Sequence, residues 1–347
     1  MSLAARLEGK IVGKWRVLEK RIKTTEDGSG AFSSCYKVEH TDNRRPAFLK
    51  AINFQYAFDQ IGQGGNFVDF IRDMTSLYTY ERDLSIFCQR HRMDRVVTAI
   101  DHGEYSETSV PYPVPYLVFD IADGSLKTMN MVSNPDIAWK LTAFHGCLVG
   151  LSQLHNSQIV HQDIKPSNIL IFGQTISRLS DLGNATIKDN PSPRWDQDLH
   201  CGDWNYAPID LLYGYCSPDW NTRRFGADFF MAGSILVFLM SAMNMQGLML
   251  SFIPDDYKHL NWGGTFEQIK PVLIDAYHKS LYQISQTFPS KIKVDLTEVV
   301  AQLCHPIPEE RGNPQNIGTT LARFSLHRYI SIVDRLATTM ALQKHII

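Results

Sequence analysis

The stretch that decides the fold of this chain is His161-Gln162-Asp163-Ile164-Lys165-Pro166-Ser167-Asn168, with Asp181-Leu182-Gly183 following it. Between the two fragments, Ile169–Phe172 and Ile176–Leu179 are short apolar runs joined at Gly173, and this pattern predicts a β-hairpin. A hairpin turns the chain back on itself, so Asp181 should return to the vicinity of Asn168. Asp, Asn and Gly are also common turn residues, but both fragments together, in this order, predict one shared site.

The residue types in this site suit the transfer of a phosphoryl group. That reaction asks a protein to position a nucleophile and to compensate the charge of the phosphates. Asp163 can orient or accept the proton of an attacking hydroxyl, and Lys165 places a cation where negative charge moves. The side-chain oxygens of Asn168 and Asp181 are of the type that binds Mg²⁺.

The loop that carries Asp163, Lys165 and Asn168 resembles the catalytic loop of serine/threonine protein kinases. The resemblance implies that Asp163 and Lys165 are catalytic, that Asn168 and Asp181 bind Mg²⁺ or Mn²⁺, and that ATP is the phosphate donor. It also implies an α+β, two-lobed fold. The expected domains are a small β-rich N-lobe at residues 1–121 and a larger helical C-lobe at residues 122–347.

A glycine pair near the N-terminus resembles the phosphate-binding loop of the same family. Gly28 and Gly30 lie between two strand-like runs, at 15–22 and 35–39. Glycines let backbone N–H groups approach phosphates closely, so the resemblance implies that both bind the nucleotide. A Gly-x-Gly pair alone is equally typical of a hairpin turn. Ser33 stands in place of the family's third glycine.

Lys50 lies in an apolar strand-like run at 47–52, where an ammonium group is costly unless it is paired. Residues 67–91 carry apolar side chains at helical spacing, and Glu81 falls on their apolar stripe. We therefore predict an ion pair between Lys50 and Glu81. The alternative is a Glu81 at the edge of the stripe that reaches solvent. In the kinase family, the corresponding lysine binds the α- and β-phosphates.

Residues 116–122 resemble the strand and hinge beside the adenine in kinases. The resemblance implies that Asp120, Ala122 and Leu170 contribute to nucleotide binding. An ordinary core strand at 116–122 remains the alternative.

The segment from Cys201 to Asp210 resembles the end of the kinase activation segment. Two registers are possible, and we favour the one that places Asp210 at the usual glutamate, because Gly202 and Tyr206 then also match the family pattern. We predict that Asp210 pairs with Arg311. If the pair is buried, loss of either partner should cost roughly 3–5 kcal/mol. If it is exposed, the pair contributes little.

Gln162 stands where the family has an arginine that binds a phosphorylated residue. Its neutral side chain predicts activity without such phosphorylation, with Thr186 and Ser192 as the available acceptors to test.

Asp203 stands where serine/threonine kinases usually carry a threonine. Its carboxylate should raise the proton affinity of Asp163 unless Lys165 screens it.

Composition excludes several other classes of protein. The 347 residues are 44% apolar and 20% charged with a net charge of −2, so we expect a packed globule without nucleic-acid or anionic-membrane partners. Six dispersed cysteines without a Cys-x-x-Cys pair, and no apolar signal core at the start, predict a cytoplasmic protein.

Residues 229–253 lack charge and are long enough to span a membrane. They resemble the family's central helix, so we expect a buried core helix there.

The favoured interpretation is a serine/threonine protein kinase that transfers phosphate from Mg·ATP to hydroxyls of protein substrates. A small-molecule kinase is one alternative, and Lys165 and Arg311 argue against it. A pseudokinase that acts as a binding module is the other, and Ser33, Phe48 and Asp203 keep it open. Phe48 replaces the small residue that the family places over the adenine.

Overall fold

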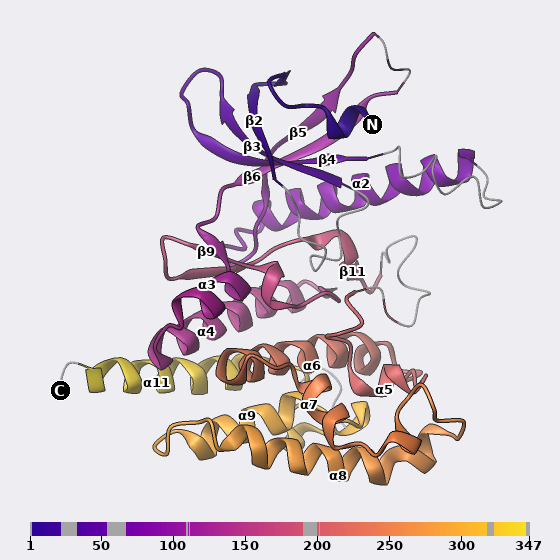
Figure 1. The fold of residues 1–347 in the computed structure, drawn as a ribbon, viewed down its shortest axis with the longest axis vertical. Helices are drawn as coiled ribbons and strands as arrows, with labels where there is room; N and C mark the ends of the chain where they lie inside the picture. Colours follow the sequence, from indigo (N-terminus) through magenta and orange to yellow (C-terminus); the bar gives the residue numbers. More distant parts are fainter. Residues whose placement is uncertain are drawn as a thin grey trace. The chain divides into compact units, whose positions relative to one another are not determined.

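The computed structural model describes residues 2–21, 33–53, 67–108, 110, 112–189, 200, 202–317 and 323–344. The chain divides into two compact units, one up to Ala122 and one from Asp123 onward. Figure 1 follows the chain from the strands of the first unit to the helices of the second.

The first unit is built on one antiparallel sheet in the order β1-β2-β3-β4-β6-β5. Its strands are β1 (Ile11–Val12), β2 (Trp15–Arg21), β3 (Ser33–His40), β4 (Pro46–Ile52), β5 (Ala99–Tyr105) and β6 (Val114–Asp120). The strands predicted at 15–22, 35–39, 47–52 and 116–122 are therefore confirmed. β4 is central, so the strand that carries Lys50 is hydrogen-bonded on both sides.

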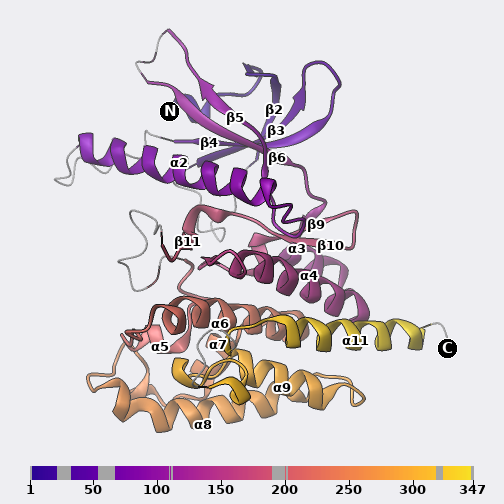
Figure 2. The same ribbon diagram turned by 180° about the vertical axis from the view of Figure 1, so that it is seen from behind.

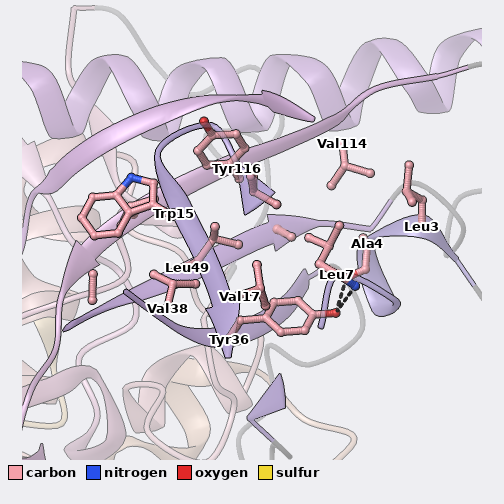
Figure 3. Packing of buried hydrophobic residues seen from close by; sticks show 14 residues of the cluster. Leu3, Ala4, Leu7, Trp15, Val17, Tyr36, Val38, Leu49, Val114 and Tyr116 are labelled. Atoms are coloured by element: carbon pink, nitrogen blue, oxygen red, sulfur yellow. Dashed lines mark hydrogen bonds between the residues drawn. The ribbon is translucent and has the colours of Figure 1, made fainter. Parts of the chain in front are cut away.

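A short turn of 3-10 helix, η1 (Leu3–Ala5), packs on this sheet. The Tyr36 hydroxyl donates a hydrogen bond to the Ala4 carbonyl at 2.6 Å and accepts one from the Leu7 N–H at 3.4 Å (Figure 3). Apolar side chains from β2, β3, β4 and β6 surround Tyr36, which is fully buried. Residues Leu3 to Leu7 thus complete one hydrophobic core of the first unit.

A second cluster joins the sheet to α2 (Phe67–Arg90), the helix predicted at 67–91. Its members are Ile52, Met74, Tyr78, Ala99 and Leu117. In both views α2 runs along the sheet (Figures 1 and 2). Because the apolar stripe faces the sheet, a polar residue on that stripe is brought into the interior.

The second unit is mainly helical. Its described α-helices are α3 (Leu126–Ser133), α4 (Ile137–His155), α5 (Ile209–Leu212), α6 (Trp220–Ser241), α7 (Met245–Phe252), α8 (Phe266–Ser285), α9 (Lys293–Leu303) and α11 (His327–Lys344). Its described 3-10 turns are η2 (Pro166–Asn168), η3 (Leu182–Asn184), η4 (Asp255–Tyr257), η5 (Pro308–Glu310) and η6 (Pro314–Asn316). Two small antiparallel sheets, β10-β9-β7 and β11-β8, carry the loops between the helices.

The strands of these sheets are short. They are β7 (Gly124–Ser125), β8 (Ile159–Val160), β9 (Ile169–Phe172), β10 (Ile176–Leu179) and β11 (Thr186–Ile187). They hold the segments before and after the loop 161–168 next to each other. In this way residues that are distant in sequence reach one site.

Local signals explain where the central helices begin and end. The Asp219 carboxylate accepts a hydrogen bond from the Thr222 N–H and caps the start of α6, while Ala242 ends the helix in the left-handed region at φ 58°. The Asn244 side chain then caps the start of α7. The uncharged run at 229–253 is thus divided between two helices.

In the part of the chain that the structure describes, one helix, α6, is long and apolar enough to cross a membrane, and 89% of the tested stretch is buried in the protein. The prediction of a core helix is confirmed. Its burial is nearly complete from Phe225 to Leu239, as expected for a helix that is apolar on all sides within a large domain.

One helix differs from the prediction. The apolar stripe at 317–342 predicts one continuous helix, and this prediction is wrong, because α11 begins only at His327 and residues 324–326 are not helical. Phe324 is buried, and its ring contacts the rings of Phe225 and Phe229 at centroid distances of 6.3 and 5.3 Å. This packing of Phe324 against α6 takes precedence over the helical pattern of the sequence.

Candidate active site

The hairpin expected after the loop 161–168 is present. β9 and β10 pair in antiparallel register from Ile169 opposite Leu179 to Phe172 opposite Ile176, and Gly173 turns with φ 55°. Beyond the hairpin, the N–H and the Oγ of Ser180 donate hydrogen bonds to the Asn168 carbonyl at 2.8 and 2.9 Å. The hairpin therefore brings Asp181 back beside Asn168, as the sequence predicted.

Asp163, Lys165 and Asn168 form one buried cluster. The Asn168 Nδ2 donates to the carbonyl oxygen and to the Oδ2 of Asp163, both at 2.9 Å. The Lys165 Nζ lies 3.2 Å from the same Oδ2. Asp163 is 3% exposed, so its carboxylate is held in a fixed orientation by neighbours instead of by water.

The electrostatics of Asp163 follow from burial and from its neighbours. Burial raises the pKa of the Asp163 carboxyl, Lys165 opposes this increase, and the Asp181 carboxylate adds to it. The interaction with Asp181 places both carboxylates in one electrostatic site. Among its neighbours, Lys165 favours the ionised form of Asp163 most strongly.

Asp203 interacts with this cluster through two different groups. Its backbone N–H donates to the Asp163 Oδ1 at 2.9 Å and lowers the pKa of Asp163, whereas its carboxylate lies 3.6 Å from the Lys165 Nζ. Burial lowers the pKa of Lys165, but the carboxylates of Asp163 and Asp203 outweigh this effect and raise it. Lys165 thus stays charged between two carboxylates, the screening on which the sequence interpretation of Asp203 depended.

Gly202 permits this approach of Asp203. A Cβ atom at position 202 would lie 2.2 Å from the Gln162 carbonyl oxygen and 3.0 Å from the Asp163 Oδ1. A separation of 2.2 Å is a severe steric clash with a backbone atom, so any residue larger than glycine would displace the chain around position 202. The sequence indicated Gly202 only as part of a family pattern, because its neighbours in space are distant in sequence.

Asp228 of α6 binds backbone N–H groups of the loop 161–168. Its Oδ2 accepts from the His161 N–H and its Oδ1 from the Gln162 N–H, both at 2.8 Å, and Asp228 is fully buried. Asp228 therefore braces the backbone of the loop 161–168. The Oδ2 also contacts the Nε2 of His155 at 2.9 Å, an interaction that the sequence did not indicate.

His161 connects the two halves of the site. Its Nδ1 accepts from the Asp163 N–H at 3.3 Å, so its Nε2 carries the proton and donates to the Ser180 carbonyl at 3.0 Å. His161 is fully buried. The imidazole thereby fixes the separation of Asp163 from the strand that leads to Asp181.

Gln162 has two partners that sequence reasoning missed. Its Nε2 donates to the Asn184 carbonyl at 3.0 Å, and its Oε1 accepts from the Arg224 Nη1 at 2.5 Å. Arg224 lies on α6 and is 2% exposed. No local signal marks Arg224 in the sequence, because its role depends on how α6 packs beneath the loop.

One expectation about Gln162 needs correction. Thr186, proposed as an available phosphate acceptor, is fully buried in β11 and pairs with Val160 of β8. A kinase cannot reach a hydroxyl in that position without opening the strand pair. Ser192, the other candidate, lies outside the described residues.

In the first unit, the predicted ion pair is present. The Lys50 Nζ lies 2.8 and 3.0 Å from the two carboxylate oxygens of Glu81, and Glu81 is 7% exposed. The alternative of a Glu81 that points to solvent is therefore wrong. Strand β4 supplies the lysine and the sheet-facing side of α2 supplies the carboxylate.

The structure does not test the roles of the other residues that we predicted to bind the nucleotide. Asp120 ends β6 and forms an ion pair with Arg45 on the surface of the first unit, Ala122 is the last residue of that unit, and Leu170 is half-buried in β9. Gly28 and Gly30 lie outside the described residues. Their roles in nucleotide binding stay predictions.

The second unit contains the predicted pair of Asp210 and Arg311. The Arg311 Nη2 lies 2.6 Å from the Asp210 Oδ1, and the side chains are 1% and 6% exposed. Arg311 also donates to the carbonyls of His305 and Gly226 and stacks over the Phe230 ring. The prediction of a buried pair is confirmed.

The residues around Asn168 fit a magnesium ion. The Asn168 amide nitrogen is committed to Asp163, so the amide oxygen is the atom suited to a cation. Asp181 adopts left-handed dihedrals, φ 65° and ψ 77°, which are strained for an aspartate and typical of functional sites. Among the described residues no group of three metal-ligating side chains occurs. Mg²⁺ needs only one or two protein ligands when phosphates supply others.

Comparison with known proteins agrees with this geometry. A relative in Caenorhabditis elegans, the serine/threonine-protein kinase chk-1, is 26% identical over 54% of this chain and 34% of its own length. A probable cell division protein kinase of Encephalitozoon cuniculi is 27% identical over 58% of this chain and 57% of its own length. The CTD kinase subunit alpha of Saccharomyces cerevisiae is 23% identical over 61% of this chain and 36% of its own length. The matches thus span between about a third and somewhat more than half of these relatives.

The model of the protein kinase domain family matches residues 23–320, most of the chain. This region contains the Lys50–Glu81 pair, the loop 161–168, Asp181 and the Asp210–Arg311 pair. The expected α+β class is borne out, with a strand-rich first unit and a helical second unit. The chain therefore belongs to the protein kinase domain family, a family of phosphotransferases.

Proposed function

We propose that this chain transfers the γ-phosphate of Mg·ATP to serine or threonine hydroxyls of protein substrates. The observation that carries the proposal is the buried cluster in which Lys165 and Asn168 both contact the Asp163 carboxylate. The relatives named as serine/threonine kinases support the choice of acceptor. Lys165 supports it as well, because kinases of small molecules usually lack that lysine.

Asp163 receives the proton in the proposed reaction. The oxygen of the acceptor hydroxyl forms a bond to the γ-phosphorus while the bond from phosphorus to the β–γ bridging oxygen breaks, and ADP leaves. The hydroxyl proton passes to the Asp163 carboxylate. Two contacts keep this carboxylate oriented for the task, the Asn168 amide at 2.9 Å and the Asp203 N–H at 2.9 Å.

Lys165 compensates charge during the transfer. Its ammonium is buried and is kept protonated by Asp163 and Asp203, so it is prepared for negative charge that moves through the site. The side-chain oxygens of Asn168 and Asp181 would hold the metal ion. When bound, Mg²⁺ neutralises and orients the phosphates. Lys50, oriented by Glu81, is the proposed contact to the α- and β-phosphates.

A pseudokinase remains the second candidate, because Ser33 opens β3 without the third glycine and Phe48 lies on β4 as a bulky, half-buried residue. Ser33 and Phe48 lie on β3 and β4, which are neighbouring strands of the sheet. Nucleotide binding without turnover is the result that would favour this candidate. Phosphorylation of a metabolite instead of protein would favour a small-molecule kinase.

Transfer of labelled phosphate from ATP in the presence of Mg²⁺ or Mn²⁺ tests the proposal. The wild-type chain is compared with Asp163→Asn, using a general protein substrate and analysis of the phosphoamino acids. We expect label on serine or threonine, and a loss of at least about 10²-fold in the variant with nucleotide binding retained. The control is Asp256→Asn, which makes the same chemical change at an exposed position in η4. Near-normal transfer by Asp163→Asn would remove Asp163 from the mechanism.

A cytoplasmic location stays a prediction that rests on the dispersed cysteines. The five cysteines that the structure describes are free thiols, and four of them are buried. This state is compatible with a reducing compartment. Fractionation of cells that express the chain tests the location directly.

A further inference from the structure

Asp203 lies close to the position that an acceptor hydroxyl occupies in the proposed reaction. The hydroxyl hydrogen-bonds to the Asp163 carboxylate before it transfers its proton, and the Asp203 N–H donates to the Oδ1 of the same carboxylate at 2.9 Å. Two groups that both hydrogen-bond to one carboxylate lie within about 8 Å of each other. Trp204 follows Asp203 in the chain, so both residues are within reach of the side chains that neighbour the acceptor in a substrate.

The side chains of Asp163, Lys165 and Asp203 together carry one excess negative charge. The Lys165 Nζ lies 3.2 Å from the Asp163 Oδ2 and 3.6 Å from the Asp203 Oδ2, so one cation is shared between two carboxylates. The Asp203 side chain is 18% exposed, whereas that of Lys165 is 6% exposed. A positively charged substrate group is therefore attracted to this place, and a negatively charged group is repelled.

The Asp203 carboxylate is held in place by its own segment of the chain. Its Oδ1 accepts hydrogen bonds from the N–H and from the Nδ2 of Asn205, at 3.0 and 2.9 Å. Asn205 is neutral, so it orients the carboxylate without compensating its charge. Because this carboxylate is already ordered, a cation that meets it loses little binding free energy to ordering of the site.

Trp204 adds an aromatic surface beside this carboxylate. It is 47% exposed, although its backbone carbonyl accepts a hydrogen bond from the Nε2 of buried Gln246 at 2.8 Å. Its ring also meets the His200 ring edge to face at a centroid distance of 5.2 Å. A half-exposed indole that is fixed in this way offers a face for the carbon stem of a lysine or arginine, and its ring attracts their positive charge.

His200 does not repel a cation at this place. Burial lowers the pKa of His200 to about 4, so its imidazole is neutral at pH 7. An apolar substrate side chain would contact the Trp204 ring but leave the charge of Asp203 uncompensated. A lysine or arginine side chain meets the ring and the carboxylate at once.

We propose that Asp203 and Trp204 are specificity-determining residues, which select protein substrates with a lysine or arginine directly before or after the acceptor serine or threonine. The inference rests on the proposed function, because the hydrogen bond to Asp163 places the acceptor. The threonine that serine/threonine kinases usually carry in place of Asp203 has no charge. The selection is therefore a property of this chain.

Three peptides that differ only beside the acceptor test the selection. Each has a central serine flanked on both sides by lysine, by norleucine or by glutamate, and norleucine is lysine without its ammonium group. We expect kcat/KM for phosphate transfer from Mg·ATP to be at least about tenfold higher for the lysine peptide than for the norleucine peptide, and lowest for the glutamate peptide. A smaller preference for lysine, or a faster glutamate peptide, would overturn the inference.

Variants of the two residues locate the selection. Asp203→Asn keeps the backbone N–H and removes the charge, and Trp204→Ala removes the ring. The ratio of kcat/KM between the lysine and norleucine peptides should fall at least about threefold in each variant. This ratio is measured within one protein, so a general loss of activity does not affect it. An unchanged ratio in either variant would overturn the role of that residue.

Control variants make the same changes elsewhere in the second unit. Asp256→Asn removes an exposed carboxylate of η4, and Tyr282→Ala removes a ring that is 73% exposed on α8. Both should keep the wild-type ratio. Asp203→Glu, which retains the charge, should keep more of the preference for lysine than Asp203→Asn does. Thermal unfolding identifies a variant that fails to fold, and the remaining variants still decide the result.

Peptide binding separates a failure of this inference from a failure of the proposed function. The same three peptides with alanine in place of serine are titrated into the full chain with Mg²⁺ and a non-hydrolysable ATP analogue. Calorimetry should show at least about tenfold tighter binding of the lysine peptide than of the glutamate peptide, with a smaller difference in Asp203→Asn. If that result holds but no peptide is phosphorylated, the proposed function fails and the selection stands. Equal affinities in the wild-type chain would overturn the selection, whether or not phosphate is transferred.

Discussion

Two ion pairs, Arg311–Asp210 in the second unit and Lys50–Glu81 in the first, differ in how completely they are enclosed. Arg311 and Asp210 are 1% and 6% exposed, and Arg311 has further bonds to two carbonyls and a contact with the Phe230 ring. Lys50 and Glu81 are 17% and 9% exposed. The Arg311–Asp210 pair is therefore enclosed in the interior, whereas the lysine of the Lys50–Glu81 pair stays partly accessible to solvent.

From this difference we expect a structural role for the Arg311–Asp210 pair and a role in the reaction for the Lys50–Glu81 pair. Burial raises the pKa of Asp210 although Arg311 opposes this increase, so desolvation outweighs the attraction of the pair. Such a pair adds little net stability, yet the loss of one partner leaves the other charge buried and uncompensated. An accessible lysine beside a carboxylate, in contrast, can meet a phosphate without breaking the fold.

The largest expected effect is on stability, from Arg311→Met. The variant leaves Asp210 charged in the interior and should lower the free energy of unfolding by roughly 3–5 kcal/mol. Urea unfolding measures the change. Arg335→Met is the control, because it breaks an exposed pair with Asp295 at 3.1 Å and should cost no more than about 1 kcal/mol. Equal losses in both variants would contradict the distinction.

The double variant Asp210→Leu with Arg311→Met sharpens this test. Removal of both charges eliminates the uncompensated carboxylate, so much of the lost stability should return. A double variant that is less stable than Arg311→Met alone would show that the pair itself contributes net stability.

His200 adds a buried group that remains neutral. It is 7% exposed; burial, with a smaller contribution from Arg224, lowers the pKa of His200 to about 4, below its ordinary value of 6.5. Between these values the unfolded chain binds a proton that the folded chain excludes, so stability falls as pH falls from 6.5 to 4. The contribution is at most roughly 3 kcal/mol.

The pH dependence of unfolding for wild type and His200→Gln checks this expectation. The variant should lose less stability between pH 6.5 and pH 4 than the wild type. His278→Gln, at an exposed position of α8, serves as control and should follow the wild type. Parallel curves for wild type and His200→Gln would mean that His200 titrates normally in the folded protein.

Lys50→Met should affect activity much more than stability. We expect phosphate transfer to fall roughly 10²–10³-fold, as for loss of one charge-stabilising donor. The free energy of unfolding should fall by only roughly 1–2 kcal/mol, because the pair is partly exposed. Steady-state kinetics and urea unfolding of the same preparation provide both numbers. Unchanged turnover would place Lys50 outside the reaction.

The smallest expected effect concerns phosphorylation. Gln162 is neutral and hydrogen-bonds Asn184 and Arg224, so the loop 161–168 has an internal support where an arginine would need a phosphate. Ser192→Ala, or treatment with phosphatase, should therefore change activity by less than about twofold. Loss of activity after either treatment would show that a phosphorylated residue is required.

Sequence reasoning succeeded where interactions between neighbouring residues of one short segment determine its structure. The hairpin after Asn168, the stripe that carries Glu81 and the apolar α6 each follow from periodicity and turn chemistry over a few residues. It failed for the start of α11, where contacts of Phe324 with α6 override the local pattern. Sequence reasoning also predicted that Thr186 is accessible to phosphorylation, whereas Thr186 is buried where β11 pairs with β8.

By itself the sequence determined the family, the main helices and strands, and the identity of Lys50, Glu81, Asp163, Asn168 and Asp181 as one candidate set. Only the tertiary structure decided that Gly202 must lack a side chain, that Arg224 supports Gln162, and that His155 contacts Asp228. The physical reason is the range of the interactions. Periodicity and turn preferences act between neighbours in the chain, whereas steric exclusion and buried hydrogen bonds act between residues that meet only after packing.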